Sequence, residues 1–248
     1  MIPVSDADVH RQRVPVVNIS LITINTLVFL YELTLNDFDT YIFILRHGLI
    51  PIELSSGHDF NNFLFPGGTI SIDSPLGTWG TVFSSMFIHA GLMHFASNMI
   101  FLWVFGDNIE DRLGRVKYLI FYLVAGIAAA WAHSTIYSDS QTPLIGASGA
   151  ISGVLGGYLL IYPYSRIRTL VIFYFITFIR IPAIFWVGFW FIKQLFHGIG
   201  SLAPTAQISG VAFFAHIGGF LSGLLLIALF KLLIREPIWP RRITYKDT

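Results

Sequence analysis

Long apolar runs, separated by short polar and basic stretches, dominate the pattern of this chain. A helix needs about 20 predominantly apolar residues to cross a hydrocarbon core roughly 30 Å thick. The runs approach or exceed that length, and they predict six membrane-spanning helices. These runs cover residues 16–33, 91–105, 116–136, 147–163, 183–196 and 209–234.

The first two runs are joined by a long connection, residues 36–80. It contains two apolar stretches, residues 41–52 and 60–65, which are too short to cross a bilayer. We expect both stretches to lie in the membrane interface. The predicted fold class is therefore an all-α membrane protein, a bundle of six transmembrane helices with a long first loop.

The region before the fifth run could form one long span or two short ones, and the basic residues separate these alternatives. Lys and Arg concentrate in loops that should face the cytoplasm. The alternation is kept if residues 170–179 form an interfacial segment and residues 183–196 a single span. Residues 1–15 and 235–248 are then cytoplasmic tails of a six-span domain, residues 16–234. The basic residues that mark the predicted cytoplasmic segments are Arg11, Arg13, Arg112, Arg115, Lys117, Arg166, Arg168, Lys231, Arg235, Arg241, Arg242 and Lys246.

Composition agrees with a protein embedded in a lipid bilayer. Hydrophobic residues make up 54% of the chain and charged residues only 12%, about half the charged fraction of an ordinary soluble domain. A net charge of +1 gives no indication of a nucleic-acid partner. The absence of cysteine excludes disulfides, thiol catalysis and Cys-ligated zinc, and we expect no cofactor or metal. The first run lacks a small-residue cleavage site, so we expect it to be retained.

Four polar residues inside the predicted spans are candidates for chemistry, because such groups are costly in a membrane. His94 and Asn98 are four residues apart and share one helix face. Ser148 begins the fourth run within the tiny residues 146–153, and His216 lies near the start of the sixth. All four fall in the outer halves of spans that enter from the same face, so we expect them at one depth.

These residue types can form a nucleophilic site. A serine hydroxyl needs a base, and a neutral imidazole is the usual base near pH 7. Ser148 and His216 would form that pair, while Asn98, His94 and the unpaired backbone N–H of Ser148 could stabilise an oxyanion. Since no carboxylate is placed to orient His216, helix packing would have to hold its ring. Ser152, one turn deeper, is the rival nucleophile, and its depth argues for a packing role.

A stripe of small residues on the sixth run could dock against the fourth and bring the two side chains together. The stripe on the sixth run consists of His216, Gly219 and Gly223, and the facing one of Ser148, Ser152 and Gly156.

Four short motifs resemble the signatures of rhomboid intramembrane serine proteases. Residues 146–149 (Gly-Ala-Ser-Gly) are similar to GxSG, residues 94–98 to HxxxN, and residues 215–219 to AHxxG. Residues 110–114, after the second run, are similar to ExRxG. The resemblance covers about residues 82–234, and the order and spacing of the motifs make it specific.

The resemblance implies a role for each matching residue. Ser148 would be the nucleophile, His216 the base, and His94 and Asn98 the oxyanion donors. The fifth span and residues 198–208 would gate access from the lipid. At the position of Ser152 some members carry an aromatic beneath the catalytic histidine, so the support of the His216 ring stays unassigned. The implied structural residues are Glu110, Arg112, Gly146, Gly219 and Gly223.

We therefore expect a serine endopeptidase that cleaves transmembrane segments of other membrane proteins near the outer face, in a prokaryotic cell membrane. Because helices hide their carbonyl groups, substrates should carry small or helix-weakening residues at the cut. The alternative is a non-catalytic rhomboid-like protein that binds membrane clients; such proteins lose the Ser or the His, and this chain keeps both. A transporter is less favoured, because the sequence shows no internal repeat.

Overall fold

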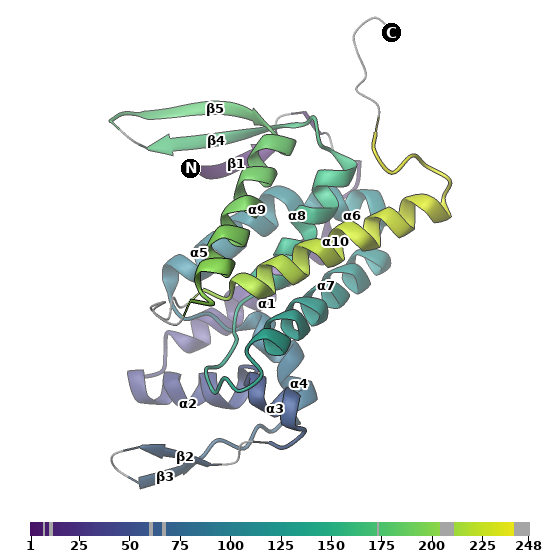
Figure 1. Ribbon diagram of the computed structural model, residues 1–248. Helices are drawn as coiled ribbons and strands as arrows, with labels where there is room; N and C mark the ends of the chain where they lie inside the picture. The colour runs from purple at the N-terminus through teal and green to yellow at the C-terminus, as the bar shows by residue number, and fades with distance from the viewer. Residues whose placement is uncertain are drawn as a thin grey trace, which may run out of the picture.

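The computed structural model of the protein describes residues 1–6, 8–9, 12–59, 62–65, 68–172, 174–203 and 211–240, which are mostly helical (Figure 1). The expected start of the last span at residue 209, the tail beyond residue 240 and part of the expected gate, residues 204–208, lie outside these ranges. The elements are β1 (Ile2–Asp6), α1 (Val16–Glu32), α2 (Asp37–His47), α3 (Pro51–Ser56), β2 (Asn62–Phe65), β3 (Gly68–Ser71), α4 (Gly77–Ser84), the short 3-10 helix η1 (Ser85–Phe87), α5 (Leu92–Phe101), the π-helical turn η2 (Leu102–Gly106), α6 (Asp107–Leu113), α7 (Arg115–Ile136), α8 (Ser148–Ile161), β4 (Arg166–Ile172), β5 (Ile176–Pro182), α9 (Ala183–Gly200) and α10 (Phe213–Leu233).

Two of the described helices, α7 and α10, are long and apolar enough to cross a membrane. A third candidate is the pair of helical segments Gly77–Phe87 and Leu92–Leu113, which bend by 81° at their junction. Helices α1 and α8 are apolar but shorter. Helical membrane character thus agrees with the sequence, whereas the count of six spans stays a prediction.

The N-terminus of α1 is capped from a distant part of the chain. The Glu110 carboxylate in α6 accepts hydrogen bonds from the backbone N–H groups of Val17 (3.0 Å) and Asn18 (2.7 Å). A carboxylate at this position satisfies unpaired N–H groups and interacts favourably with the helix dipole. Glu110 therefore fixes the start of α1 against α6.

Helix α8 packs against α10 through glycines. A Cβ atom added at Gly219 would lie 2.0 Å from the Gly149 carbonyl oxygen, and one at Gly223 would lie 2.0 Å from the Gly153 carbonyl oxygen. No side chain fits in such contacts, so glycine is what allows the two backbones to approach. The predicted stripe on the sixth run lies in this interface. On α8, however, the glycines that Gly219 and Gly223 meet are Gly149 and Gly153, each one residue after the expected Ser148 and Ser152.

The structure contains five short strands in addition to its helices, so the predicted all-α fold class is incomplete. The segment 170–179, expected as an interfacial stretch of no stated structure, belongs to the antiparallel hairpin β4–β5, and β1 pairs antiparallel with β4. Its β-branched and aromatic residues favour strands. Arg166 at the hairpin base pairs with Asp8, with Nε 2.9 Å from Oδ2. This hydrogen-bonded pair lowers the pKa of Asp8, whereas burial raises the pKa of Asp6.

The connection at residues 36–80 contains α2, α3, the hairpin β2–β3 and the start of α4. The Asn36 side chain caps α2 by accepting the Asp39 backbone N–H at 2.9 Å. Leu49, after α2, exchanges two backbone hydrogen bonds with Leu144, in the loop before α8. This bridge ties the connection to the segment that leads into α8.

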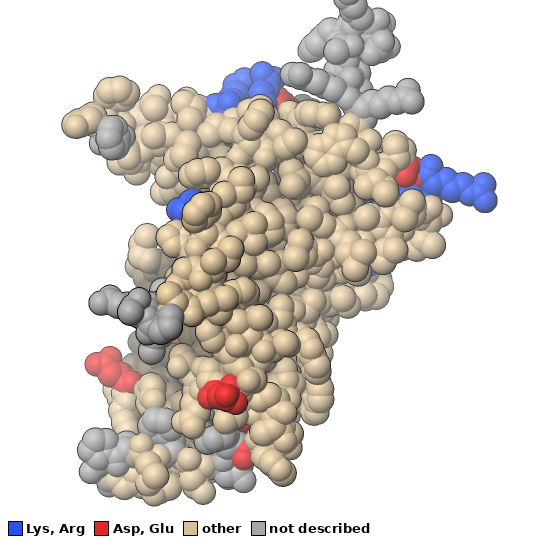
Figure 2. Space-filling view, in the orientation of Figure 1, with Lys and Arg blue, Asp and Glu red and all other residues tan. Residues whose placement is uncertain are grey.

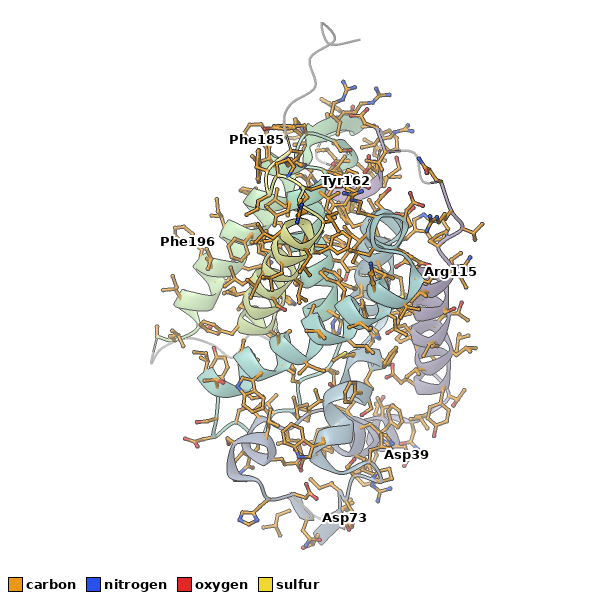
Figure 3. The ribbon with its side chains drawn as sticks, turned by 90° about the vertical axis from the view of Figure 1, so that its right-hand side faces the viewer. Asp39, Asp73, Arg115, Tyr162, Phe185 and Phe196 are labelled. Atoms are coloured by element: carbon orange, nitrogen blue, oxygen red, sulfur yellow. The ribbon has the colours of Figure 1, made fainter. Side chains whose placement is uncertain are left out.

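Charges separate toward the two ends of the molecule (Figure 2). Blue atoms of Lys and Arg gather at the end where β1, β4 and β5 lie, and red atoms of Asp and Glu gather mainly at the opposite end, where α2 lies (Figures 1 and 2). In the view turned by 90°, Asp39 and Asp73 lie at the end opposite Tyr162 and Phe185 (Figure 3). The body between them is largely apolar, as a protein embedded in a bilayer requires.

Candidate active site

Ser148 and His216 lie next to each other at one end of the α8–α10 interface. Ser148 is the first residue of α8, and His216 lies in the first turn of α10. The distance between the Ser148 Oγ and His216 Nε2 atoms is 2.8 Å, which is a good hydrogen-bond length. The close approach of the two helix backbones brings these side chains within reach of each other.

The second nitrogen of the His216 ring determines the direction of this hydrogen bond. Nδ1 lies 2.9 Å from the side-chain oxygen Oε1 of Gln194 in α9. An amide oxygen can only accept, so Nδ1 carries the ring proton and donates it. The neutral ring then presents a lone pair at Nε2, to which the Ser148 hydroxyl donates. An imidazole in this state can take a proton from serine as a general base.

Gln194 is not among the candidate residues predicted from the sequence. It lies four residues after Trp190, so both side chains share the face of α9 that meets α10. The centroids of the Trp190 and His216 rings are 6.0 Å apart. Support for His216, which the sequence left unassigned, thus comes from α9. Gln194 could have been found from the sequence, because it is an amide inside the predicted span 183–196. The same feature, an amide within an apolar run, made Asn98 a candidate.

Asn98 supplies a buried donor without an acceptor. Its side chain is 5% exposed, and Nδ2 has no hydrogen-bond partner among the described residues. Leaving a buried donor unpaired costs about 1–3 kcal/mol, so such a group calls for an explanation. An amide that awaits a developing negative charge is one explanation that the chemistry of the site provides.

His94 approaches Ser148 across Gly146. A Cβ atom added at Gly146 would lie 2.6 Å from His94 Nε2 and 3.7 Å from Ser148 Oγ. Gly146 also has a φ of +112°, which side chains rarely adopt. The Ala90 backbone N–H donates to His94 Nδ1 at 3.4 Å, so the ring proton of a neutral His94 lies on Nε2. The donor nitrogen of His94 therefore faces the space beside Ser148.

Ser152 is enclosed in the helix packing. It is 1% exposed, and its hydroxyl donates to the Ser148 carbonyl oxygen at 2.6 Å. No imidazole hydrogen bond to its oxygen occurs among the described residues. The two serines thus differ in environment, since the hydroxyl of Ser148 faces a base and that of Ser152 faces its own helix backbone.

Glu110 and Arg112 lie far from Ser148 in the fold and make structural contacts. Glu110 caps α1, as described above, and Arg112 forms an ion pair with Glu236 beyond the end of α10. Nearby, Asn18 accepts a hydrogen bond from the Tyr118 hydroxyl at 2.7 Å and donates to the Leu102 carbonyl oxygen at 3.0 Å. These polar groups are mutually satisfied and join α1, η2 and α7.

The length of α8 bears on the depth of Ser148. Fourteen residues form α8, which at 1.5 Å per residue makes a helix about 21 Å long. This is shorter than a hydrocarbon core of roughly 30 Å. Ser148, the first residue of this short helix, is partly exposed.

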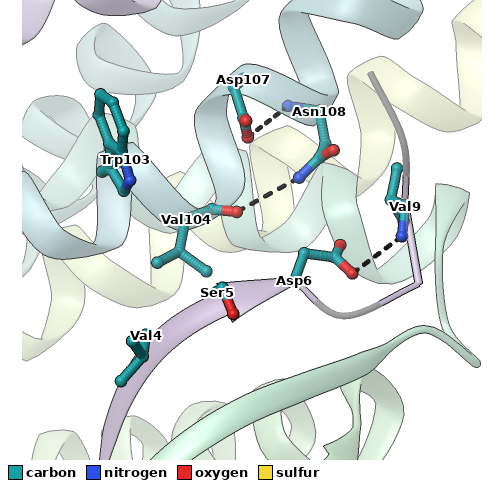
Figure 4. A pocket seen from close by; sticks show the side chains of 8 residues that line it. All are labelled: Val4, Ser5, Asp6, Val9, Trp103, Val104, Asp107 and Asn108. Carbon is teal, nitrogen blue, oxygen red and sulfur yellow. Dashed lines mark hydrogen bonds between the residues drawn. The ribbon is translucent and has the colours of Figure 1, made fainter. Parts of the chain in front are cut away.

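A pocket beside β1 lies apart from these residues (Figure 4). Its polar groups already bond within the chain, because Asn108 donates to the Val104 carbonyl oxygen at 3.3 Å and Asp6 accepts the Val9 backbone N–H at 3.2 Å. Neither Ser148 nor His216 lines it. The pocket is formed by Val4, Ser5, Asp6, Val9, Trp103, Val104, Asp107 and Asn108.

Comparison with known proteins gives a family. A family model of the Rhomboid domain matches residues 76–232. Rhomboid protease GluP of Bacillus subtilis is 36% identical over 90 residues, which are 36% of this chain and 17% of that protein. Rhomboid protein 1, mitochondrial, of Saccharomyces cerevisiae is 28% identical over 154 residues, 58% of this chain and 40% of that protein. Presenilin-associated rhomboid-like protein, mitochondrial, of Homo sapiens is 30% identical over 162 residues, which are 62% of this chain and 39% of that protein.

The same comparisons correct the expected location. The two longer matches are to mitochondrial proteins of yeast and human, and a plant relative, RHOMBOID-like protein 6 of Arabidopsis thaliana, is mitochondrial as well. The expectation of a prokaryotic cell membrane is therefore wrong. The chain spans between 17% and 40% of the length of the three relatives described above.

Proposed function

Because the chain belongs to the rhomboid family, we propose that it is an intramembrane serine endopeptidase, with Ser148 as nucleophile and His216 as general base. The observation that carries the proposal is the 2.8 Å contact between Ser148 Oγ and His216 Nε2, in a ring whose other nitrogen is bonded to Gln194. This contact supplies what serine needs to become a nucleophile near neutral pH.

In the proposed reaction, Ser148 Oγ attacks the carbonyl carbon of a substrate peptide bond while its proton passes to His216 Nε2. The resulting imidazolium gives that proton to the leaving amine, and an acyl-enzyme forms. Water, activated by the same nitrogen, then attacks the ester and releases Ser148. The imidazolium keeps its hydrogen bond to Gln194 throughout, because Nδ1 stays protonated in both states.

The oxyanion of the tetrahedral intermediate would be stabilised by three donors. These are the Asn98 amide, the His94 Nε2–H group and the backbone N–H of Ser148, which lies in the first turn of α8 and has no intrahelical acceptor. Donors that are fixed before the reaction stabilise the transition state without reorganisation. The unpaired Asn98 Nδ2 supports this assignment.

The proposed substrates are transmembrane segments of other membrane proteins. Ser148 lies at the start of a short helix within an apolar body, so a substrate in the bilayer could reach it laterally. A substrate helix hides its carbonyl groups in backbone hydrogen bonds, and small or helix-weakening residues at the cut would expose one.

We further propose that residues 16–234 cross the membrane six times, through α1, the segment around α5, α7, α8, α9 and α10. Six spans place both chain ends on one side of the membrane, which agrees with Figure 1, where β1 and the end of α10 both lie in the upper part of the molecule. The similarity to mitochondrial relatives favours a mitochondrial membrane.

Purified protein, reconstituted with a single-span test substrate, should cleave it. Ser148→Ala and His216→Ala should each reduce cleavage to background, and a serine-directed fluorophosphonate should label the protein at Ser148 only. Ser152→Ala is the matched control, since it removes a hydroxyl one turn away, and it should retain most activity. Cleavage by Ser148→Ala together with loss in Ser152→Ala would assign the nucleophile to Ser152.

Failure of both cleavage and labelling at Ser148 would instead favour a client-binding role. In that case the wild-type protein and Ser148→Ala should retain the same single-span membrane proteins equally well.

A further inference from the structure

The β4–β5 hairpin carries an exposed apolar tip that the proposed proteolysis does not use. Large exposed apolar patches mark sites of interaction with proteins or membranes. The side chains at and near this tip have fractional exposures between 38% and 88%. They are Ile172, Tyr174, Phe175, Ile176, Phe178 and Ile179.

One face of the hairpin changes from basic to apolar along its length. Side chains of directly paired residues lie on the same face, and every second residue of a strand shares that face. The Arg168 guanidinium lies 4.5 Å from the centroid of the Phe178 ring, so the basic and apolar parts of this face are in contact. From base to tip the pairs are Arg168 with Arg180, Leu170 with Phe178, and Ile172 with Ile176.

The base of the hairpin is fixed where two apolar helices end. Helix α8 ends at Ile161, shortly before β4 begins at Arg166, and α9 begins at Ala183, directly after β5 ends at Pro182. From this level the hairpin runs sideways, out past the upper end of α9 (Figure 1). A seven-residue strand spans about 23 Å, so the tip extends laterally over the zone that lipid headgroups would occupy.

The charge around the hairpin matches an anionic surface. Within the sequence, no acidic residue lies between Asp139 and Glu236. The acidic residues beside the hairpin base come from the N-terminal segment, where Asp8 is paired with Arg166 and Asp6 accepts a hydrogen bond from Ser165. Figure 2 shows basic atoms at the hairpin base and an uncharged outer part. A basic segment beside a membrane is attracted to anionic lipids, while apolar and aromatic side chains favour the boundary between headgroups and acyl chains.

We propose that the β4–β5 hairpin is a lipid-binding element of the membrane face opposite Ser148. Its tip inserts below the headgroups, and Arg168 and Arg180 bind anionic headgroup phosphates. The bilayer is favoured over a protein partner because the hairpin is held at membrane level by α8 and α9. This proposal does not depend on proteolysis.

A single introduced cysteine tests the position of the tip, because the chain has no cysteine of its own. The Phe175→Cys variant carries a nitroxide label at the tip. Leu225→Cys, on an exposed face of α10, is the reference for a label in lipid. Asp139→Cys, in the loop before α8, is the reference for a label in water. The protein is reconstituted in phosphatidylcholine vesicles with and without phosphatidylglycerol. Electron paramagnetic resonance compares the accessibility of each label to oxygen and to a water-soluble nickel chelate.

The label at position 175 should be protected from the nickel chelate, like that at position 225, and should move deeper when phosphatidylglycerol is present. Arg168→Gln/Arg180→Gln should abolish this added depth, since each basic residue near an anionic surface is worth roughly a fivefold preference. Arg115→Gln, which changes an exposed arginine outside the hairpin, should leave the added depth unchanged. The proposal would be overturned if the label at position 175 were as accessible to the nickel chelate as the label at position 139. It would also be overturned if the depth of the label changed neither with phosphatidylglycerol nor with the double substitution.

Discussion

The Gln194 side-chain oxygen lies 2.9 Å from Nδ1 of His216, across the interface between α9 and α10. This contact places the ring proton on Nδ1 and leaves Nε2 free to accept a hydrogen bond from the Ser148 hydroxyl. In the proposed reaction, Gln194 would orient the His216 ring as a carboxylate does in a Ser-His-Asp triad, although it carries no charge. Three predictions concern this site and the packing around it, and a fourth concerns the β1–β4 sheet.

Gln194 should matter as a hydrogen-bond acceptor. Gln194→Met keeps the side-chain length but removes the acceptor, so both ring tautomers become populated and kcat should fall by roughly 10–10²-fold with little change in KM. Gln194→Glu keeps an acceptor and should retain most of kcat. Kinetics with a single-span substrate, together with ¹⁵N NMR of the His216 ring, measure both effects.

Lys193→Met, at the adjacent exposed position, controls for changes in α9 itself and should leave kcat and the ring tautomer unchanged. Equal kcat for wild type and Gln194→Met would show that the ring needs no acceptor. A fall in thermal stability without a change of tautomer would reduce Gln194 to a packing residue.

Asn98→Ala removes the buried amide that lacks an acceptor. We expect kcat to fall by about 10²–10³-fold, the usual effect of losing one oxyanion donor, while thermal stability stays the same or rises because the unpaired donor is gone. Steady-state kinetics and thermal unfolding in detergent check the two parts. A large loss of stability with normal kcat per folded molecule would assign Asn98 to helix packing.

Gly219→Ala should disrupt the α8–α10 interface, because the new Cβ would lie 2.0 Å from the Gly149 carbonyl oxygen. Overpacking of this kind costs about 1–3 kcal/mol or more, and separation of the helices should also reduce fluorophosphonate labelling of Ser148. Gly188→Ala in α9 is the matched control, because a Cβ there meets nothing within 4 Å. Equal melting temperatures for the two variants would show that the interface can expand without cost.

The Asp8–Arg166 pair should make the stability of the β1–β4 sheet depend on pH. Arg166 holds the pKa of Asp8 below its ordinary value of 3.8. The resulting stability is present above that value and is lost as the pH falls through the lower pKa of the folded state. The pair is largely exposed, so we expect only about 0.2–1 kcal/mol.

Asp8→Asn removes this contribution at every pH. The difference in unfolding free energy between wild type and Asp8→Asn should therefore be largest near neutral pH and should shrink below about pH 4. Denaturant unfolding across that range measures it. A difference that stays constant with pH would show that the carboxylate charge contributes nothing.

The sequence determined the identity of the polar groups and much of the helical order. Residues 116–136 were predicted as a span and form α7 from Arg115 to Ile136, because a long apolar run leaves few alternatives in a membrane. Ser148, His216, His94 and Asn98 could be selected since polar groups are costly in apolar runs. The family motifs lie within the matched Rhomboid domain.

Other features depended on contacts between segments far apart in the chain. The role of Gln194 became visible only when α9 packed against α10, because a single amide in an apolar run does not reveal which helix it faces. The strands β4 and β5 were missed because their apolar residues suit an interfacial segment equally well, and only pairing with each other and with β1 defines a sheet. Periodicity and composition report the environment of one segment, whereas a hydrogen bond across helices or strands depends on where the rest of the chain lies.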